Sequence, residues 1–72
     1  GKFIVSLPEI LDLLRTAGAE PAVPVPGTLN SARILRCEDI IGIDRDGNHC
    51  SMLSVITAAD GVIITAFPGL WH

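Results

Sequence analysis

The chain has 72 residues, of which 49% are hydrophobic, and its formal net charge is −3. This length allows one small domain, and the composition is too apolar for a disordered chain. The acidic balance argues against broad binding to nucleic-acid phosphates but leaves room for a local basic site. No apolar run approaches the roughly 20 residues of a membrane-spanning helix, so we expect no membrane partner.

We expect residues 1–72 to form a single domain, and the abrupt ends favour a module cut from a longer protein. The N-terminus does not resemble a signal peptide, because only three apolar residues separate Lys2 from Ser6. Cys37 and Cys50 have no accompanying Cys-x-x-Cys or histidine pair, so no metal site is predicted. Two free, buried thiols are favoured over one disulfide, because small secreted scaffolds usually carry more cysteines.

An amphipathic helix is predicted between Leu7 and Ala17. Ser6 and Glu9 have the spacing of a capping box, and Pro8 is tolerated in the first helical turn. The apolar side chains that recur at helical spacing are expected to face the core, and they are Leu7, Ile10, Leu11 and Leu14.

The rest of the chain is predicted to be extended. Prolines between Glu20 and Asn30 favour an extended crossing segment. Residues Arg33 to Asp44 are predicted to form a strand, with a break near Glu38-Asp39. The following turn, with Asp46-Gly47 at its tip, would pair Ile43 with Cys50.

Residues His49 to Pro68 are two apolar, β-branched runs joined by Ala59-Asp60-Gly61, which predicts a β-hairpin. A two-residue loop would pair Ala59 with Val62 and place Thr65 on the face of Ile56. A three-residue loop, which we favour, would pair Ala58 with Val62 and place Thr65 on the opposite face. The difference matters because a shift of one residue reverses every side chain of the second strand.

These elements predict an α+β domain in which one N-terminal helix packs on an antiparallel β-meander of three to four strands. The helix is expected on the face of small and aliphatic residues, namely Cys50, Met52, Ser54, Ile56, Ala58, Val62, Ile64 and Ala66. The opposite face mixes polar with apolar residues and is the better place for a site; it comprises His49, Ser51, Leu53, Val55, Thr57, Ile63, Thr65 and Phe67.

Several polar side chains have both a structural and a functional interpretation. Arg33 and Arg36 fit a solvated strand edge, but either could hold a phosphate by paired hydrogen bonds. Thr57 and Thr65 are good strand formers, and a strand threonine can also donate its hydroxyl to a phosphate oxygen. His49 fits an exposed turn residue or a general acid or base near neutral pH.

The segment from Gly61 to Pro68, Gly-Val-Ile-Ile-Thr-Ala-Phe-Pro, resembles the last strand of bacterial ribonuclease toxin domains of the barnase–EndoU–colicin–RelE superfamily. The resemblance covers about the last 35 residues. It implies a site in which a strand threonine lies with a histidine and a basic residue. Thr65 matches that threonine by position, whereas His49 and Arg36 are candidates because we expect them on the same sheet face.

The resemblance implies a toxin-type endoribonuclease that cleaves RNA, either tRNA or mRNA, by attack of a 2′-hydroxyl on the adjacent phosphate. His49 would transfer a proton, Arg36 would stabilise the phosphorane charge and Thr65 would orient a non-bridging oxygen. No cofactor or metal ion is required. The site of action would be the cytoplasm, with the domain secreted or delivered as part of a larger protein and neutralised by an immunity protein.

A second hypothesis is a non-catalytic protein–protein interaction module. The predicted sheet is apolar on both faces, whereas only one helix is available to cover it. One face would then bind a homodimer mate, another part of a longer protein or an immunity protein.

Overall fold

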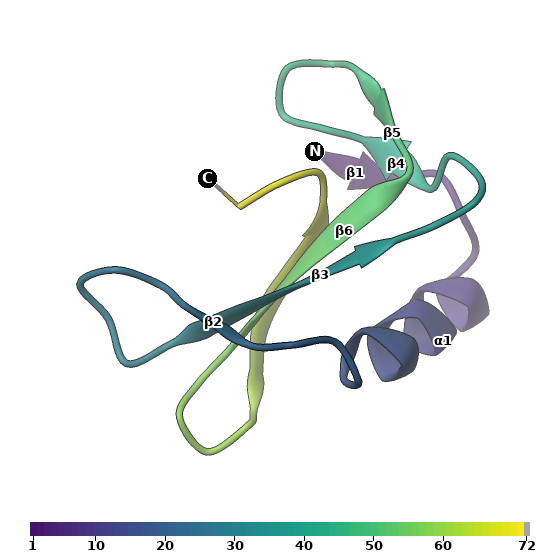
Figure 1. Cartoon of the computed structure of the whole chain (residues 1–72). Helices are drawn as coiled ribbons and strands as arrows, with labels where there is room; N and C mark the ends of the chain where they lie inside the picture. The colour runs from purple at the N-terminus through teal and green to yellow at the C-terminus, as the bar shows by residue number, and fades with distance from the viewer. Residues whose placement is uncertain (72) are drawn as a thin grey trace.

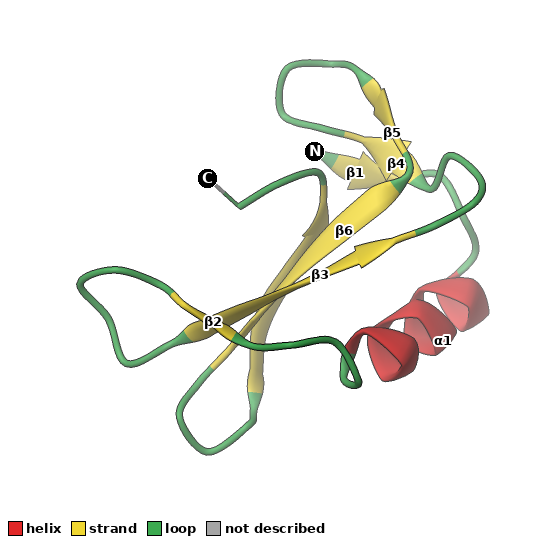
Figure 2. Ribbon diagram, in the orientation of Figure 1, coloured by secondary structure: helices red, strands yellow, loops and turns green. Residues whose placement is uncertain are grey.

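The computed structural model describes residues 1–71 and has the predicted α+β architecture, with one helix beside antiparallel strands (Figure 1 and Figure 2). The elements in chain order are β1 (Lys2–Phe3), α1 (Leu7–Ala17), β2 (Val23–Pro24), β3 (Ser31–Arg36), β4 (Gly42–Ile43), β5 (His49–Cys50), β6 (Met52–Thr57) and β7 (Ile63–Pro68).

The strands form two antiparallel sheets, one with the order β2-β3-β6-β7 and the other with the order β1-β4-β5. The predicted break after β3 is confirmed, because residues 37–41 leave the larger sheet before β4 begins. The chain returns to the larger sheet at Ser51, whose carbonyl accepts a hydrogen bond of 2.6 Å from the N–H of Cys37. The β4–β5 hairpin therefore projects from one end of the larger sheet (Figure 1).

The helix has the predicted bounds, but the predicted capping box does not form. Ser6 occupies the N-cap position without a side-chain hydrogen bond, and its carbonyl accepts from the N–H of Ile10 at 3.0 Å. Pro8 has no N–H, so a side-chain cap from Ser6 would depend on the N–H of Glu9 alone. The helix therefore starts at Leu7 without a side-chain cap.

The helix packs on the sheet face opposite to the predicted one. The core consists of Ala17, Leu35, Ile41, Leu53 and Val55, with Leu13, Leu14 and Ala66 packed against it. Leu35, Leu53 and Val55 share this face because Leu35 pairs with Leu53 and the side chains of β6 alternate between the two faces. The predicted helix stripe is also wrong in part, because Leu7 is 66% exposed and Leu11 is 55% exposed.

The three-residue loop of the β6–β7 hairpin is as predicted. The N–H of Ala58 donates to the carbonyl of Val62 at 2.8 Å, and Gly61 has a φ of 90°. A β-bulge follows, however, so that Thr57 pairs with Ile63 but Ile56 pairs with Thr65. The bulge moves Thr65 to the face of Ile56, which corrects the face predicted for it.

The β4–β5 hairpin differs from its predicted register by one residue. Ile43 pairs with His49, and Gly42 pairs with Cys50. The N–H of Asp44 donates to the carbonyl of Asn48 at 2.9 Å, which closes a three-residue loop. The Asp44 carboxylate also accepts from the backbone N–H groups of Asp46 at 2.9 Å and Asn48 at 3.0 Å, so this side chain favours the longer turn.

The two sheets touch where Gly42 lies against Pro68 at the end of β7. A Cβ atom on Gly42 would lie 2.5 Å from the Cγ of Pro68 and 2.6 Å from the carbonyl oxygen of Lys2. Such distances are far below ordinary carbon contacts of about 3.5–4.0 Å, so only glycine fits. Ile41, just before it, is buried in the core.

We predict that Leu53→Ala lowers the free energy of unfolding by about 2–5 kcal/mol, because Leu53 is fully buried between sheet and helix. Leu11→Ala is the matched control and should change stability by less than about 0.5 kcal/mol, since Leu11 is mostly exposed. Urea unfolding followed by circular dichroism measures both. Equal losses from the two variants would contradict the observed helix orientation.

Candidate functional site

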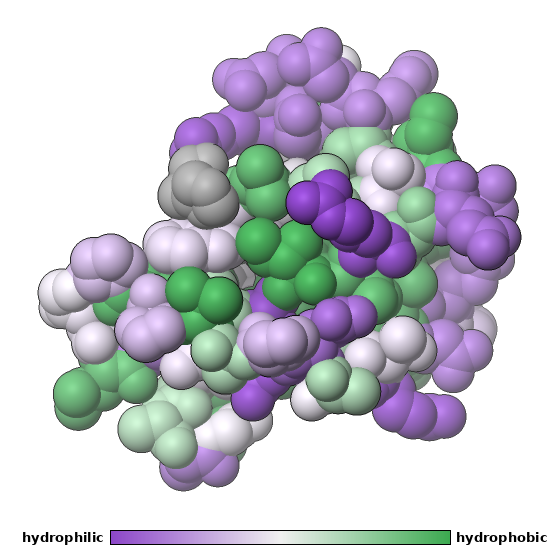
Figure 3. Space-filling model, viewed as in Figure 1, coloured by the Kyte–Doolittle hydropathy of each residue, from purple (hydrophilic) through white to green (hydrophobic). Residues whose placement is uncertain are grey.

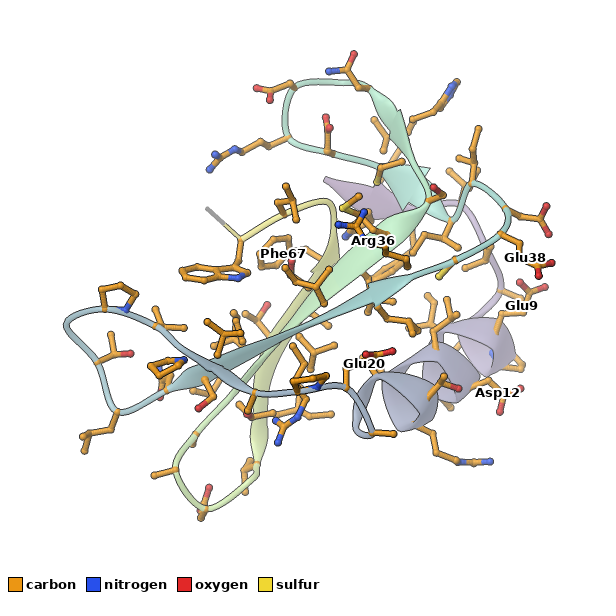
Figure 4. All side chains as sticks on the ribbon, viewed as in Figure 1. Glu9, Asp12, Glu20, Arg36, Glu38 and Phe67 are labelled. Carbon is orange, nitrogen blue, oxygen red and sulfur yellow. The ribbon has the colours of Figure 1, made fainter. Side chains whose placement is uncertain are left out.

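Arg36 and Thr65 lie on the same face of the larger sheet, the one opposite α1. Arg36 pairs with Met52 and Thr65 pairs with Ile56, and these partners are four residues apart on β6. Arg36 and Phe67 project over this face (Figure 4). Figure 3 shows the same side, with hydrophobic atoms over the middle of the sheet and hydrophilic atoms over the β4–β5 hairpin.

The side chains of Arg36 and Thr65 do not converge. Their partners on β6 are four residues apart, which separates the two residues by about 13 Å along the strand. They also lie on the two strands that flank β6, and strand side chains stand roughly perpendicular to the sheet. The two groups therefore face different parts of the surface.

His49 lies in the other sheet, on β5, opposite Ile43. Its side chain is exposed and makes no hydrogen bond or ion pair with the residues that the structure describes. The expectation that His49 shares a face with Arg36 is wrong, because Arg36 pairs with Met52 and the chain changes sheets at Ser51. The structure thus brings two of the three predicted catalytic residues to one face and none of them into contact.

A hollow of about 310 Å³ lies between α1 and the segment 37–41. Its apolar lining comprises Val5, Leu13, Leu35, Ile40 and Ile41, and its polar lining comprises Glu9, Thr16, Arg36, Cys37, Glu38 and Asp39. Glu9 and Glu38 lie near each other in Figure 4, beside the start of α1. Within residues 1–71, no three His, Cys, Asp or Glu side chains are placed to hold a metal ion.

Both cysteines are free thiols, as predicted, but they are half-buried and not buried. Burial raises the pKa of Cys37, and the nearby Cys50 raises it further. The Cys37 thiol is therefore mostly protonated at neutral pH, and a protonated thiol is a poor nucleophile. Cys37 consequently suits the wall of the hollow better than covalent catalysis.

A second hollow, of about 200 Å³, lies beside the end of α1 and contains a polar pair. Arg33 Nη1 donates a hydrogen bond of 2.9 Å to Thr57 Oγ1. The pair forms because Arg33 lies opposite Val55, which makes Thr57 its diagonal neighbour on the same face. Leu14, Val55 and Ile63 form apolar walls around it.

The Arg33 guanidinium is incompletely paired. Its Nε is buried and has no hydrogen-bond partner in the described part of the chain. Among the described residues, Arg15 forms an ion pair with Asp12, whereas no carboxylate lies within ion-pair distance of Arg33. The sequence analysis identified Arg33 and Thr57 separately as candidate phosphate ligands. Their contact could not be predicted from the residues around either one, because it depends on how β3 pairs with β6.

Comparisons of the chain with protein-family models, with curated proteins and with solved structures found no match. No helix in residues 1–71 combines the length and apolar character needed to cross a membrane.

We predict that iodoacetamide alkylates Cys37 more slowly in the folded protein than in the urea-unfolded chain at about pH 8. The raised pKa leaves less thiolate, so the folded rate should keep rising at a pH where the unfolded rate has levelled off. In the Cys50→Ser variant only Cys37 can be alkylated, so mass spectrometry measures its rate alone. Burial, which is the larger cause of the raised pKa of Cys37, still acts in this variant. Identical pH profiles for folded and unfolded chains would refute the prediction.

Proposed function

We propose that this domain is a protein–protein interaction module that binds a partner through the side of α1 that carries Leu7 and Leu11. The observation that carries the proposal is an apolar surface, which we call the helix–hairpin surface, formed by Leu7, Leu11, Leu14 and Ile63. Leu7, Leu11 and Leu14 follow one another at helical spacing, and Leu14 and Ile63 line the same hollow. The surface is therefore continuous from helix to hairpin.

The exposure of this surface supports a binding role. Leu7, Leu11 and Ile63 are 66%, 55% and 47% exposed, respectively. Complete burial of such a side chain contributes about 1.5–3 kcal/mol, so covering three of them would supply a large part of a binding free energy. Soluble monomers rarely leave contiguous apolar surface uncovered without a function.

The edge strand β7 extends the same surface. It lies at one side of the larger sheet, so half of its backbone groups have no strand partner. The segment from Gly61 to Trp71 carries no charged residue, although charges on edge strands are a common protection against pairing. A partner that covers the helix–hairpin surface would also cover this edge.

We predict that the wild-type domain associates at micromolar concentration, with itself or with the product of the adjacent gene, and that Leu11→Asp weakens association at least about tenfold. A charge at this position would have to be desolvated on binding. Leu29→Asp is the matched control, because Leu29 is 86% exposed but lies in the β2–β3 loop. Sedimentation velocity measures association.

Two results would overturn this proposal. One is a wild-type domain that sediments as a monomer both alone and with the product of the adjacent gene. The other is association that Leu11→Asp and Leu29→Asp weaken equally, which would place the contact elsewhere.

The second candidate is the metal-independent ribonuclease. Its support is that Thr65 and Arg36 are exposed on one sheet face, together with the resemblance of the final strand to ribonuclease toxins. His49 would act as acid or base, Arg36 would stabilise charge and Thr65 would orient a phosphate oxygen. The separation of these residues makes it the weaker proposal, since the RNA would have to bring distant groups together.

If the domain is a ribonuclease, its production in bacteria should arrest growth, and purified protein should cut RNA in the presence of EDTA. The products should end in 2′,3′-cyclic phosphates, because no metal-activated water takes part. His49→Ala should lower the rate by about 10²–10⁴-fold. Thr65→Val keeps the strand shape and removes only the hydroxyl, so it separates catalysis from folding. Folded wild-type protein that leaves RNA intact would eliminate this candidate.

A further inference from the structure

Arg33 is a half-buried cation that the described chain does not neutralise. One of its five N–H donors bonds to Thr57, and Nε is enclosed without a partner. Glu20 lies near the end of α1 (Figure 4), but it forms no ion pair with Arg33. A buried guanidinium normally has a carboxylate or another anion beside it.

The end of α1 accounts for part of the charge balance. Gly18, which follows the last helical residue, lines the hollow that contains Arg33. A helix C-terminus carries about −0.5 elementary charge, which offsets at most about half of a guanidinium charge. The hollow therefore keeps a net positive character inside walls formed by Leu14, Val55 and Ile63.

We propose that this hollow receives the carboxylate of an aspartate or glutamate side chain from the partner protein. Arg33 supplies the remaining N–H donors of its two Nη atoms. Thr57 can also donate, because its oxygen accepts from Arg33 while its hydroxyl hydrogen stays available. The inference rests on the proposed interaction function, and it adds a charged contact at one end of the helix–hairpin surface.

The size and lining of the hollow favour a protein carboxylate over an RNA phosphate. Its volume of about 200 Å³ is below the roughly 300–1,000 Å³ of typical small-molecule sites, so it fits one side chain. The aliphatic stem of a glutamate would contact the apolar walls, whereas a phosphate offers no apolar atoms. The net charge of −3 also opposes the approach of a polyanion.

The test uses two neutral-backbone probes that differ in one group, N-acetylglutamate amide and N-acetylglutamine amide. Nitrogen-15 NMR titration of the folded domain follows the backbone signals of Thr57 and Gly61 and the Nε–H signal of Arg33. We expect the glutamate probe to bind about 10–100-fold more tightly, the ratio expected for a hydrogen bond to a charged group. Inorganic phosphate is titrated in parallel.

Two variants localise the effect. Arg33→Gln should remove the preference for the glutamate probe, and Thr57→Val should reduce it. Arg45→Gln is the matched control, since Arg45 lies in the exposed β4–β5 turn and should leave the preference unchanged. Circular dichroism checks that each variant is folded, and the comparison of the two probes on wild-type protein needs no variant.

Equal binding of the two probes, or no binding of either, would overturn the proposal. Tighter binding of inorganic phosphate than of the glutamate probe would also overturn it, by assigning the hollow to phosphate. Because the probes are single amino-acid derivatives, these outcomes are independent of the association experiment with Leu11→Asp. If the probe titration fails and the association experiment succeeds, the charged contact is refuted and the interaction surface is retained.

Discussion

The contact between Gly42 and Pro68 is the constraint on which the arrangement of the two sheets depends. Gly42 is on the central strand of the smaller sheet, and Pro68 ends the outer strand of the larger one. A side chain on Gly42 would collide with Pro68 and with the backbone of Lys2, so its absence lets three segments meet at one point. Two-residue strands are too short to be stable alone, and this junction gives them the larger sheet to pack against.

With the smaller sheet fixed at one end, a single helix must cover the larger sheet. It covers the part of the face formed by β3 and β6 and leaves apolar side chains of α1 and β7 in contact with solvent. Arg33 lies at the boundary between the covered and uncovered parts. The unpaired charge and the uncovered apolar surface thus have the same cause, which is that one helix is too small to cover the whole sheet face.

Local signals in the sequence predicted the local features. The bounds of α1 followed from leucine periodicity, and Ala59-Asp60-Gly61 predicted the hairpin, although these residues allowed a two-residue as well as a three-residue loop. The faces could not be predicted, because each depends on a single-residue register shift. A bulge beside Thr65 and a longer turn after Ile43 moved residues across the sheet, and neither leaves a sequence signal as strong as glycine or proline.

The candidate site shows the same limit. The sequence identified Arg33, Arg36, Thr57 and Thr65 as groups able to bind an anion, but it could not say which of them meet. Arg33 and Thr57 meet because β3 and β6 pair in a particular register, which joins residues 24 positions apart. His49 was grouped with Arg36 by strand parity, and parity loses its meaning where the chain passes between sheets.

The β-bulge in the last hairpin has a consequence for motion. The pairs from Leu53 to Ile56 have the register that a two-residue Asp60-Gly61 turn would produce without any bulge. The hairpin tip is therefore compatible with two pairings, and converting one into the other leaves the rest of β7 in place. In the second pairing Ile64, not Ile63, lies opposite Thr57. A change from the observed pairing to the second one would therefore replace Ile63 in the wall of the hollow beside Arg33.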